Sequence, residues 1–90
     1  MTVSRSVTVA IASGIHARPA ALFVEKARTF IADLSLEHGE RKGNCKSLIS
    51  MLKLGVPHGA EVSLTASGDD EEIALTTLVD FLGSAGDDQG

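Results

Sequence analysis

Hydrophobic and polar residues alternate along three short segments of the chain, a spacing typical of strands with one buried face. The apolar positions are Val3, Val7, Val9 and Ile11 in the first segment, Leu34 and Leu36 in the second, and Val62, Leu64 and Ala66 in the third. A turn, His38-Gly39-Glu40, follows the second segment, and residues 41–45 can return beside it as a fourth strand. The pattern therefore predicts four strands, two of them joined in a hairpin.

Elsewhere, apolar residues recur every three or four positions, which is typical of helices with one buried side. The first predicted helix spans residues 17–30, and the last has its apolar residues at Ile73, Leu75, Leu78, Val79 and Leu82. A shorter helix is predicted over residues 47–54, because Ser47 is a favourable N-cap and Gly55 a favourable C-terminal stop. Residues 83–90 are expected to form a frayed tail.

The element order β-α-β-β-α-β-α predicts an α+β fold, with three helices on one face of a four-stranded, mainly antiparallel sheet. Ninety residues are enough for one domain, so we expect a single domain over residues 1–90. A two-domain enzyme with an interdomain cleft is excluded, and the chain is short for an enzyme that must enclose its substrate.

Charge is distributed unevenly along the chain, although the net charge is only −4. All eight Lys and Arg residues lie at or before Lys53, while eight of the twelve acidic residues follow it. The second part should repel nucleic acid, and no cluster of basic and aromatic residues is present to bind it. The basic first part is better suited to an acidic protein surface or a small anion.

Other features point to a cytoplasmic protein without metal or cofactor. No apolar run approaches the roughly 20 residues of a membrane span, so no membrane insertion is expected, and the N-terminal segment lacks a signal peptide's apolar core. The lone cysteine, Cys45, fits a reducing compartment, and we interpret it as a small buried hydrophobic residue. The three histidines are scattered and lack the ligand spacing of a metal site.

One segment carries the residues best suited to chemistry, namely Ser13-Gly14-Ile15-His16-Ala17-Arg18-Pro19-Ala20. Pro19 is tolerated only in the first turn of the following helix, which places His16 at or next to the N-cap. The backbone N–H groups of Ala17 and Arg18 then point out of the helix end and favour an anion. The Arg18 guanidinium adds donors that can clamp phosphate oxygens.

A neutral imidazole attacks phosphorus well and also leaves readily. His16 beside this anion site could therefore accept a phosphoryl group and give it up again. Local spacing alone equally allows a plainer interpretation, in which His16 only caps the helix or lies on the surface.

The octapeptide over residues 13–20 resembles the active-site segment of HPr, the histidine-containing phosphocarrier of the bacterial phosphoenolpyruvate:sugar phosphotransferase system. Residues 44–49, 54–56 and 59–62 resemble the second segment of that family at the expected distance. The resemblance covers roughly residues 3–82 and implies the HPr-like open-faced β-sandwich, in agreement with the predicted element order.

The resemblance implies that His16 accepts a phosphoryl group on Nδ1 from Enzyme I and passes it to a sugar-specific enzyme IIA. Arg18 would orient and neutralise the phosphate, assisted by the backbone N–H groups of Ala17 and Arg18. The protein would then be a monomeric phosphocarrier with a transient phosphohistidine rather than a stand-alone enzyme.

Ser47 matches the regulatory serine that HPr kinase/phosphorylase modifies in many relatives, and this role is compatible with an N-cap role. An alternative function follows: an HPr-like regulatory protein that acts through phosphorylated Ser47 and binds a transcription regulator or a metabolic enzyme. Family members that have lost the active histidine behave in this way, whereas His16 and Arg18 are retained here. A third class, a generic ligand-binding α+β domain, would need a pocket of which the chain gives no sign.

The helix predicted over residues 47–54 has more apolar residues than one sheet can cover, so part of its surface should be exposed. The resemblance implies a docking patch for protein partners there. Its expected members are Ala17, Lys46, Leu48, Ile49, Met51 and Leu52, with Arg18 and Lys46 as a basic rim. The alternative is a small satellite of the core.

Overall fold

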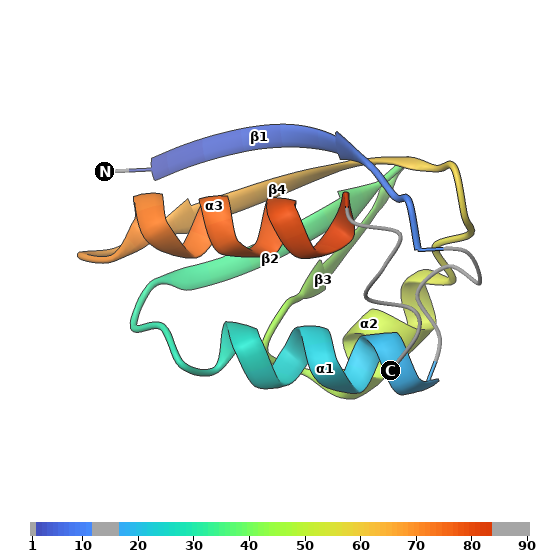
Figure 1. Ribbon diagram of the computed structural model, residues 1–90, viewed down its shortest axis with the longest axis horizontal. Coiled ribbons are helices and arrows are strands. Elements are labelled where there is room, and N and C mark those ends of the chain that lie inside the picture. Colours follow the sequence, from blue (N-terminus) through green and yellow to red (C-terminus); the bar gives the residue numbers. More distant parts are fainter. Residues whose placement is uncertain (1, 12–16, 84–90) are drawn as a thin grey trace.

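The computed structural model describes residues 2–11 and 17–83, with only the backbone given for Ala17. The elements follow the predicted order (Figure 1). The strands are β1 (Thr2–Thr8), β2 (Asp33–His38), β3 (Arg41–Asn44) and β4 (Glu61–Ser67), and the helices are α1 (Ala17–Ala27), α2 (Leu48–Leu54) and α3 (Glu71–Leu82). Of the tail predicted for residues 83–90, only Gly83 is described, and its N–H donates to the Val79 carbonyl at the end of α3; residues 84–90 lie outside the described part of the chain.

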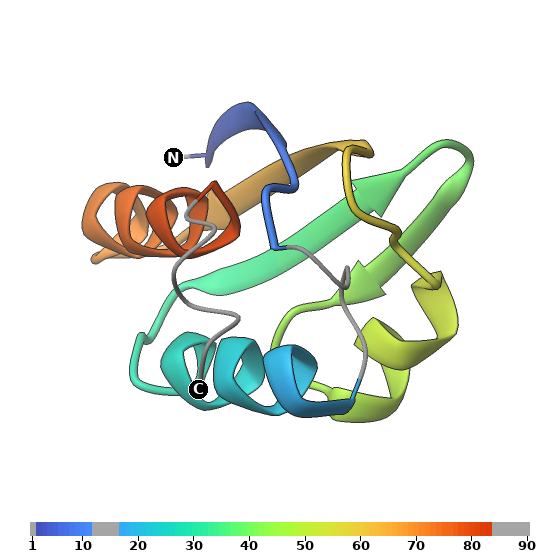
Figure 2. The same cartoon turned by 45° about the vertical axis from the view of Figure 1, so that its right-hand side comes forward.

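The four strands form one sheet in the order β1-β4-β2-β3, and every pair is antiparallel. β4 lies in the interior of the sheet, with Ala66 opposite Val3 of β1 and opposite Leu34 of β2. All three helices lie on the same side of the sheet, which leaves the other face uncovered (Figures 1 and 2). The predicted α+β arrangement is therefore confirmed.

Alternation along the strands decides which side chains reach the core. In β4, Val62, Leu64 and Ala66 point toward the helices and are buried, while the intervening Ser and Thr residues lie on the uncovered face. α3 packs on β1 and β4, α2 packs on β3, and α1 contacts both other helices. The rings of Phe23 in α1 and Phe81 in α3 join two of these helices, with centroids 5.9 Å apart.

Two helical predictions need correction. α1 ends at Ala27, so Phe30 lies in the following turn, where it packs half-buried against the core. Ile73 does not belong to the buried side of α3, because 60% of its surface is exposed. The reason lies in the first helical residue, Glu71: its side chain is buried and accepts a hydrogen bond from the Gly68 N–H at 3.0 Å. A residue two positions further along a helix points to the opposite side.

Candidate functional site

The first turn of α1 agrees with the prediction made from Pro19. The helix begins at Ala17, Pro19 occupies its first turn and is buried, and the Arg18 side chain is exposed. Residue 16 immediately precedes this helix, and the predicted position of His16 lies outside the described residues. The structure therefore describes the start of α1 and the exposed Arg18, the two features beside which His16 is predicted to act.

Three backbone hydrogen bonds anchor the chain that leads toward this helix. After β1, Val9 donates to the Ala60 carbonyl at 2.9 Å and accepts from the Gly59 N–H at 2.8 Å. Ala10 donates to the Leu82 carbonyl at the end of α3, also at 2.8 Å. Since Val9 and Ile11 are fully buried as well, the segment that leads to residue 12 is fixed by the loop before β4 and by the end of α3.

The predicted caps of α2 are both present. Ser47 has an extended backbone, and its Oγ accepts a hydrogen bond from the Ser50 N–H at 3.3 Å. Gly55 adopts the left-handed conformation, with φ of 59°, and donates its N–H to the Leu52 carbonyl. Ser47 is partly exposed, and its hydroxyl oxygen serves as the cap of the helix.

α2 presents an apolar surface to solvent, as predicted. The exposed members are Ile49, Leu52 and Leu48, at 66%, 41% and 38% of their surfaces. The prediction that Met51 belongs to this patch is wrong, because Met51 is fully buried. Met51 and Leu54 share the inner side of the helix and pack on Gly43, where a Cβ would lie only 3.0 Å from each side chain.

The exposed side of α2 continues into a groove of about 480 Å³ shared with α1. Its lining residues are Ala21, Leu22, Val24, Glu25, Arg28 and Leu48. Glu25 and Arg28 were not singled out from the sequence, where they read only as polar positions of an amphipathic helix. Their spacing of three residues, about one helical turn from Glu25 in α1 to Arg28 just beyond its end, is the signal that could have placed both beside the groove.

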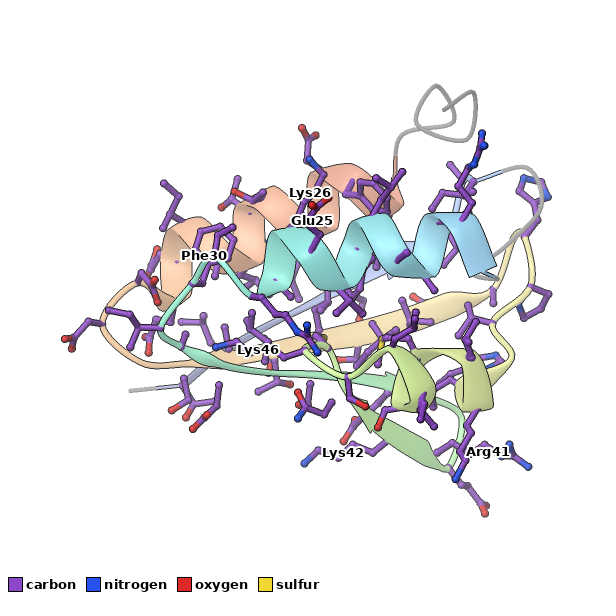
Figure 3. The ribbon with its side chains drawn as sticks, turned by 90° about the horizontal axis from the view of Figure 1, so that it is seen from below. Glu25, Lys26, Phe30, Arg41, Lys42 and Lys46 are labelled. Atoms are coloured by element: carbon purple, nitrogen blue, oxygen red, sulfur yellow. The ribbon has the colours of Figure 1, made fainter. Side chains whose placement is uncertain are left out.

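Lys46 occupies a different position from the one expected of a basic rim. Its Nζ donates to the Phe30 carbonyl at 2.7 Å, just beyond the end of α1. Its N–H donates to Asn44 Oδ1 at 2.9 Å, and its carbonyl accepts from Arg28 Nε at 3.0 Å. Figure 3 shows Lys46 near α1, on the short segment that leads from β3 into α2. Lys46 thus connects the two helices, and its role in partner binding stays a prediction.

Cys45 lies in the core directly before this connection. Its side chain is fully buried, as the sequence predicted, and its N–H donates to the Leu34 carbonyl at 3.0 Å. Burial raises the pKa of the thiol to about 12, which keeps it protonated and unreactive at neutral pH. Cys45 therefore supplies packing rather than chemistry.

Comparison with known proteins gives three findings. A family model described as "PTS HPr component phosphorylation site" matches residues 3–84. The HPr-like protein Crh of Bacillus subtilis (strain 168) is 42% identical over 80 residues, which cover 89% of this chain and 94% of Crh. The crystal structure of the phosphocarrier protein HPr from Bacillus anthracis str. Ames has a TM-score of 0.88 at 36% identity, covering 90% of this chain and 96% of that chain.

The four-stranded open sheet, with three helices on one face and an arginine at the start of α1, defines an HPr-like open-faced sandwich. The chain belongs to the HPr family.

Another solved relative, the HPr dimer from Thermoanaerobacter tengcongensis, is 47% identical with a TM-score of 0.69 and covers 82% of this chain and 87% of that chain. Because that relative is a dimer, family membership does not by itself imply the expected monomer. Within residues 2–11 and 17–83, no helix combines the length and apolarity that crossing a membrane requires.

Proposed function

We propose that the protein carries phosphoryl groups in the bacterial sugar phosphotransferase system, in the cytoplasm. His16 attacks the phosphorus of the phosphohistidine on Enzyme I, and a P–N bond to His16 forms as the P–N bond to the donor histidine breaks. A histidine of a sugar-specific enzyme IIA then attacks the same phosphorus, and His16 becomes the leaving group. The protein is converted to its phosphorylated form in the first step and regenerated in the second, so it acts as a stoichiometric carrier between two enzymes rather than as a stand-alone enzyme.

The observation that carries this proposal is the start of α1 at Ala17, directly after His16. The N–H groups of this first turn and the guanidinium of the exposed Arg18 would stabilise the negative charge of a phosphoryl group on residue 16. The exposed apolar side of α2 supplies a surface on which a protein donor and a protein acceptor can dock in turn.

The proposal is tested by incubating the protein with Enzyme I and phosphoenolpyruvate and measuring its intact mass and the acid lability of the product. We expect one acid-labile phosphoryl group that is absent from His16→Ala and present in His58→Ala, whose side chain lies exposed on a loop. Arg18→Gln should retain the label but acquire it more slowly, by about tenfold or more. No labelling by an Enzyme I that is active on another carrier would refute the proposal.

A second candidate function is regulation through Ser47, favoured by the position of this partly exposed residue at the start of the apolar α2. HPr kinase/phosphorylase would transfer the ATP γ-phosphoryl group to Ser47 Oγ, and the modified protein would bind a transcription regulator or a metabolic enzyme. Incubation with this kinase and ATP should add one acid-stable phosphoryl group to the wild type and none to Ser47→Ala. A carrier without this modification would show the first label and lack the second.

A further inference from the structure

Arg28 lies close to both neighbours of Ser47 in the sequence, Lys46 and Leu48. Arg28 Nε donates to the carbonyl of Lys46, the residue before Ser47, at 3.0 Å. Arg28 also lines the groove between α1 and α2 together with Leu48, the residue after Ser47. A cation from just beyond the end of α1 is thus held at the carbonyl of the peptide group that joins Lys46 to Ser47.

We propose that Arg28 binds the phosphoryl group when Ser47 is phosphorylated, and so withdraws its charge from the groove between α1 and α2. This inference rests on the proposed regulation through Ser47. It names Arg28 as the residue of this chain that binds the phosphoryl group on Ser47. It also adds a second consequence of the modification, because a partner would then meet a surface that has lost one cation.

The chemistry of the two groups fits this pairing. A guanidinium presents several N–H donors in a planar fork, and the Lys46 carbonyl occupies only the Nε donor. Phosphoserine brings close to two negative charges and three acceptor oxygens, which match that fork in charge and geometry. Arg28 is exposed and lines an open groove of about 480 Å³, so its side chain can move toward Ser47 without repacking the core.

Lys46 is closer to Ser47 in sequence but is poorly placed for the same task. Its ammonium donates to the Phe30 carbonyl at 2.7 Å, and its charge contributes to the lowered pKa of Asp70 at the start of α3. The Lys46 ammonium is therefore directed toward Phe30 and Asp70 rather than toward Ser47. Binding the phosphate through Lys46 would leave the Phe30 carbonyl without this donor, whereas Arg28 can keep its bond to the Lys46 carbonyl.

Glu25 opposes the pairing, because its carboxylate lines the same groove one helical turn before Arg28. The carboxylate attracts the guanidinium and repels the phosphate. Removing its charge with Glu25→Gln should therefore strengthen the contact between Arg28 and the phosphate.

The test uses the full chain with phosphoserine installed at position 47 during synthesis, so that no kinase is involved. The pKa of the phosphate is followed by phosphorus NMR, and the Arg28 Nε–H resonance by nitrogen–proton NMR. We expect Arg28→Gln to raise the phosphate pKa by about half a unit or more, and Glu25→Gln to lower it. The Nε–H resonance should titrate together with the phosphate.

Lys26→Gln is the matched control, because it removes the same charge from α1 at a side chain that lies over the Phe81 ring, 5.6 Å from its centroid. The control should leave the phosphate pKa nearly unchanged. Arg28→Lys keeps the charge without the fork and should give an intermediate value, which also covers the case in which Arg28→Gln folds poorly. Equal pKa values in the wild type, Arg28→Lys and Arg28→Gln, or an Nε–H resonance that ignores the phosphate, would overturn the inference.

The failure of this inference can be told apart from the failure of the proposed regulation. Installed phosphoserine reports on Arg28 whether or not a kinase recognises the chain. The kinase reaction on the unmodified protein reports on the regulation alone.

Discussion

Asp70 and Ala32 lie far apart in the sequence, yet the Asp70 carboxylate accepts a hydrogen bond from the Ala32 N–H at 2.8 Å. Its other oxygen accepts from the Ile31 N–H, also at 2.8 Å. Through these bonds the residue before α3 holds the connection between α1 and β2. Lys46 holds the same connection from the other side, through the Phe30 carbonyl.

Replacing Asp70 by Asn should destabilise the fold, because the amide has one acceptor oxygen where the carboxylate has two. The backbone hydrogen bond from Ile31, followed by that from Ala32, lowers the pKa of Asp70 below its ordinary value of 3.8. A lowered pKa in the folded state means that this stabilisation is present above pH 3.8 and is lost as the pH falls through the folded value.

Urea unfolding of the wild type and of Asp70→Asn at neutral and acidic pH measures this effect. The difference in the free energy of unfolding between the two proteins should shrink as the pH falls below 3.8. Asp69→Asn, which alters an exposed neighbouring acid, is the control and should unfold nearly as the wild type does. Equal effects of the two substitutions would show that the contacts to Ile31 and Ala32 are not stabilising.

Gly68 is required where the turn between β4 and α3 meets Ala32. Its φ is +152°, and a Cβ at this position would lie 2.6 Å from the Ala32 Cα, a backbone atom that cannot move aside. Gly68→Ala should therefore lower the free energy of unfolding by about 2–4 kcal/mol. Gly39→Ala, at φ +63° with open space around it, should cost only about 1 kcal/mol in the same measurement.

Ile49 and Met51 should separate docking from stability, because they lie on opposite sides of α2. Met51→Ala removes a fully buried side chain and should cost about 2–5 kcal/mol. Ile49→Ala should cost less than about 0.5 kcal/mol but raise the KM for phosphoryl transfer from Enzyme I. Unfolding by urea and the rate of phosphoryl transfer give the two readouts. An unchanged KM in Ile49→Ala would remove Ile49 from the docking patch.

Ser47→Ala should destabilise the protein by about 1 kcal/mol, since it removes the acceptor for the Ser50 N–H. Ser47→Asp restores an acceptor and should recover most of this loss. Ser50→Ala is the matched control, because Ser50 contributes its backbone N–H and not its hydroxyl to the cap. Thermal unfolding of the three variants measures the cap separately from any modification of Ser47.

Cys45 should resist thiol reagents in the folded protein. A pKa raised from 9.0 to about 12 also means that the folded state favours the protonated thiol. The stability that the folded protein gains from keeping this thiol protonated is therefore complete below pH 9 and is lost as the pH rises toward 12. Reaction with a disulfide reagent, with and without denaturant, tests accessibility. Cys45→Ala should lose less stability than the wild type as the pH rises from 9 to 12. A fast reaction of the thiol in the folded protein would contradict its buried position.

Three of the strands could be predicted well because their burial pattern depends on neighbouring residues. The first predicted strand extends to Ile11, whereas β1 ends at Thr8. In β4 the buried side chains alternate along the chain itself, and both caps of α2 rest on residues adjacent to the helix. These features use local spacing and backbone geometry, which a single sequence contains.

The remaining features depend on contacts between distant residues, which periodicity does not contain. Ile73 fits the apolar spacing of α3, but the buried Glu71 sets the rotation of that helix. Asp70 reads as helix-end charge, yet its side chain makes no cap bond and holds Ile31 and Ala32 instead. Lys46 reads as a surface cation and lies between two helices. In each case the partner lies on another element of the fold.

The strand order β1-β4-β2-β3 has a consequence for folding on the ribosome. β1 is made before β4, its neighbour in the sheet, and Thr2 must wait for Ser67 to complete the pair. β2 and β3 can close their hairpin as soon as both are synthesised. The nascent chain therefore carries β1 with open hydrogen-bonding edges for most of its synthesis, the interval in which chaperones would be most useful to it.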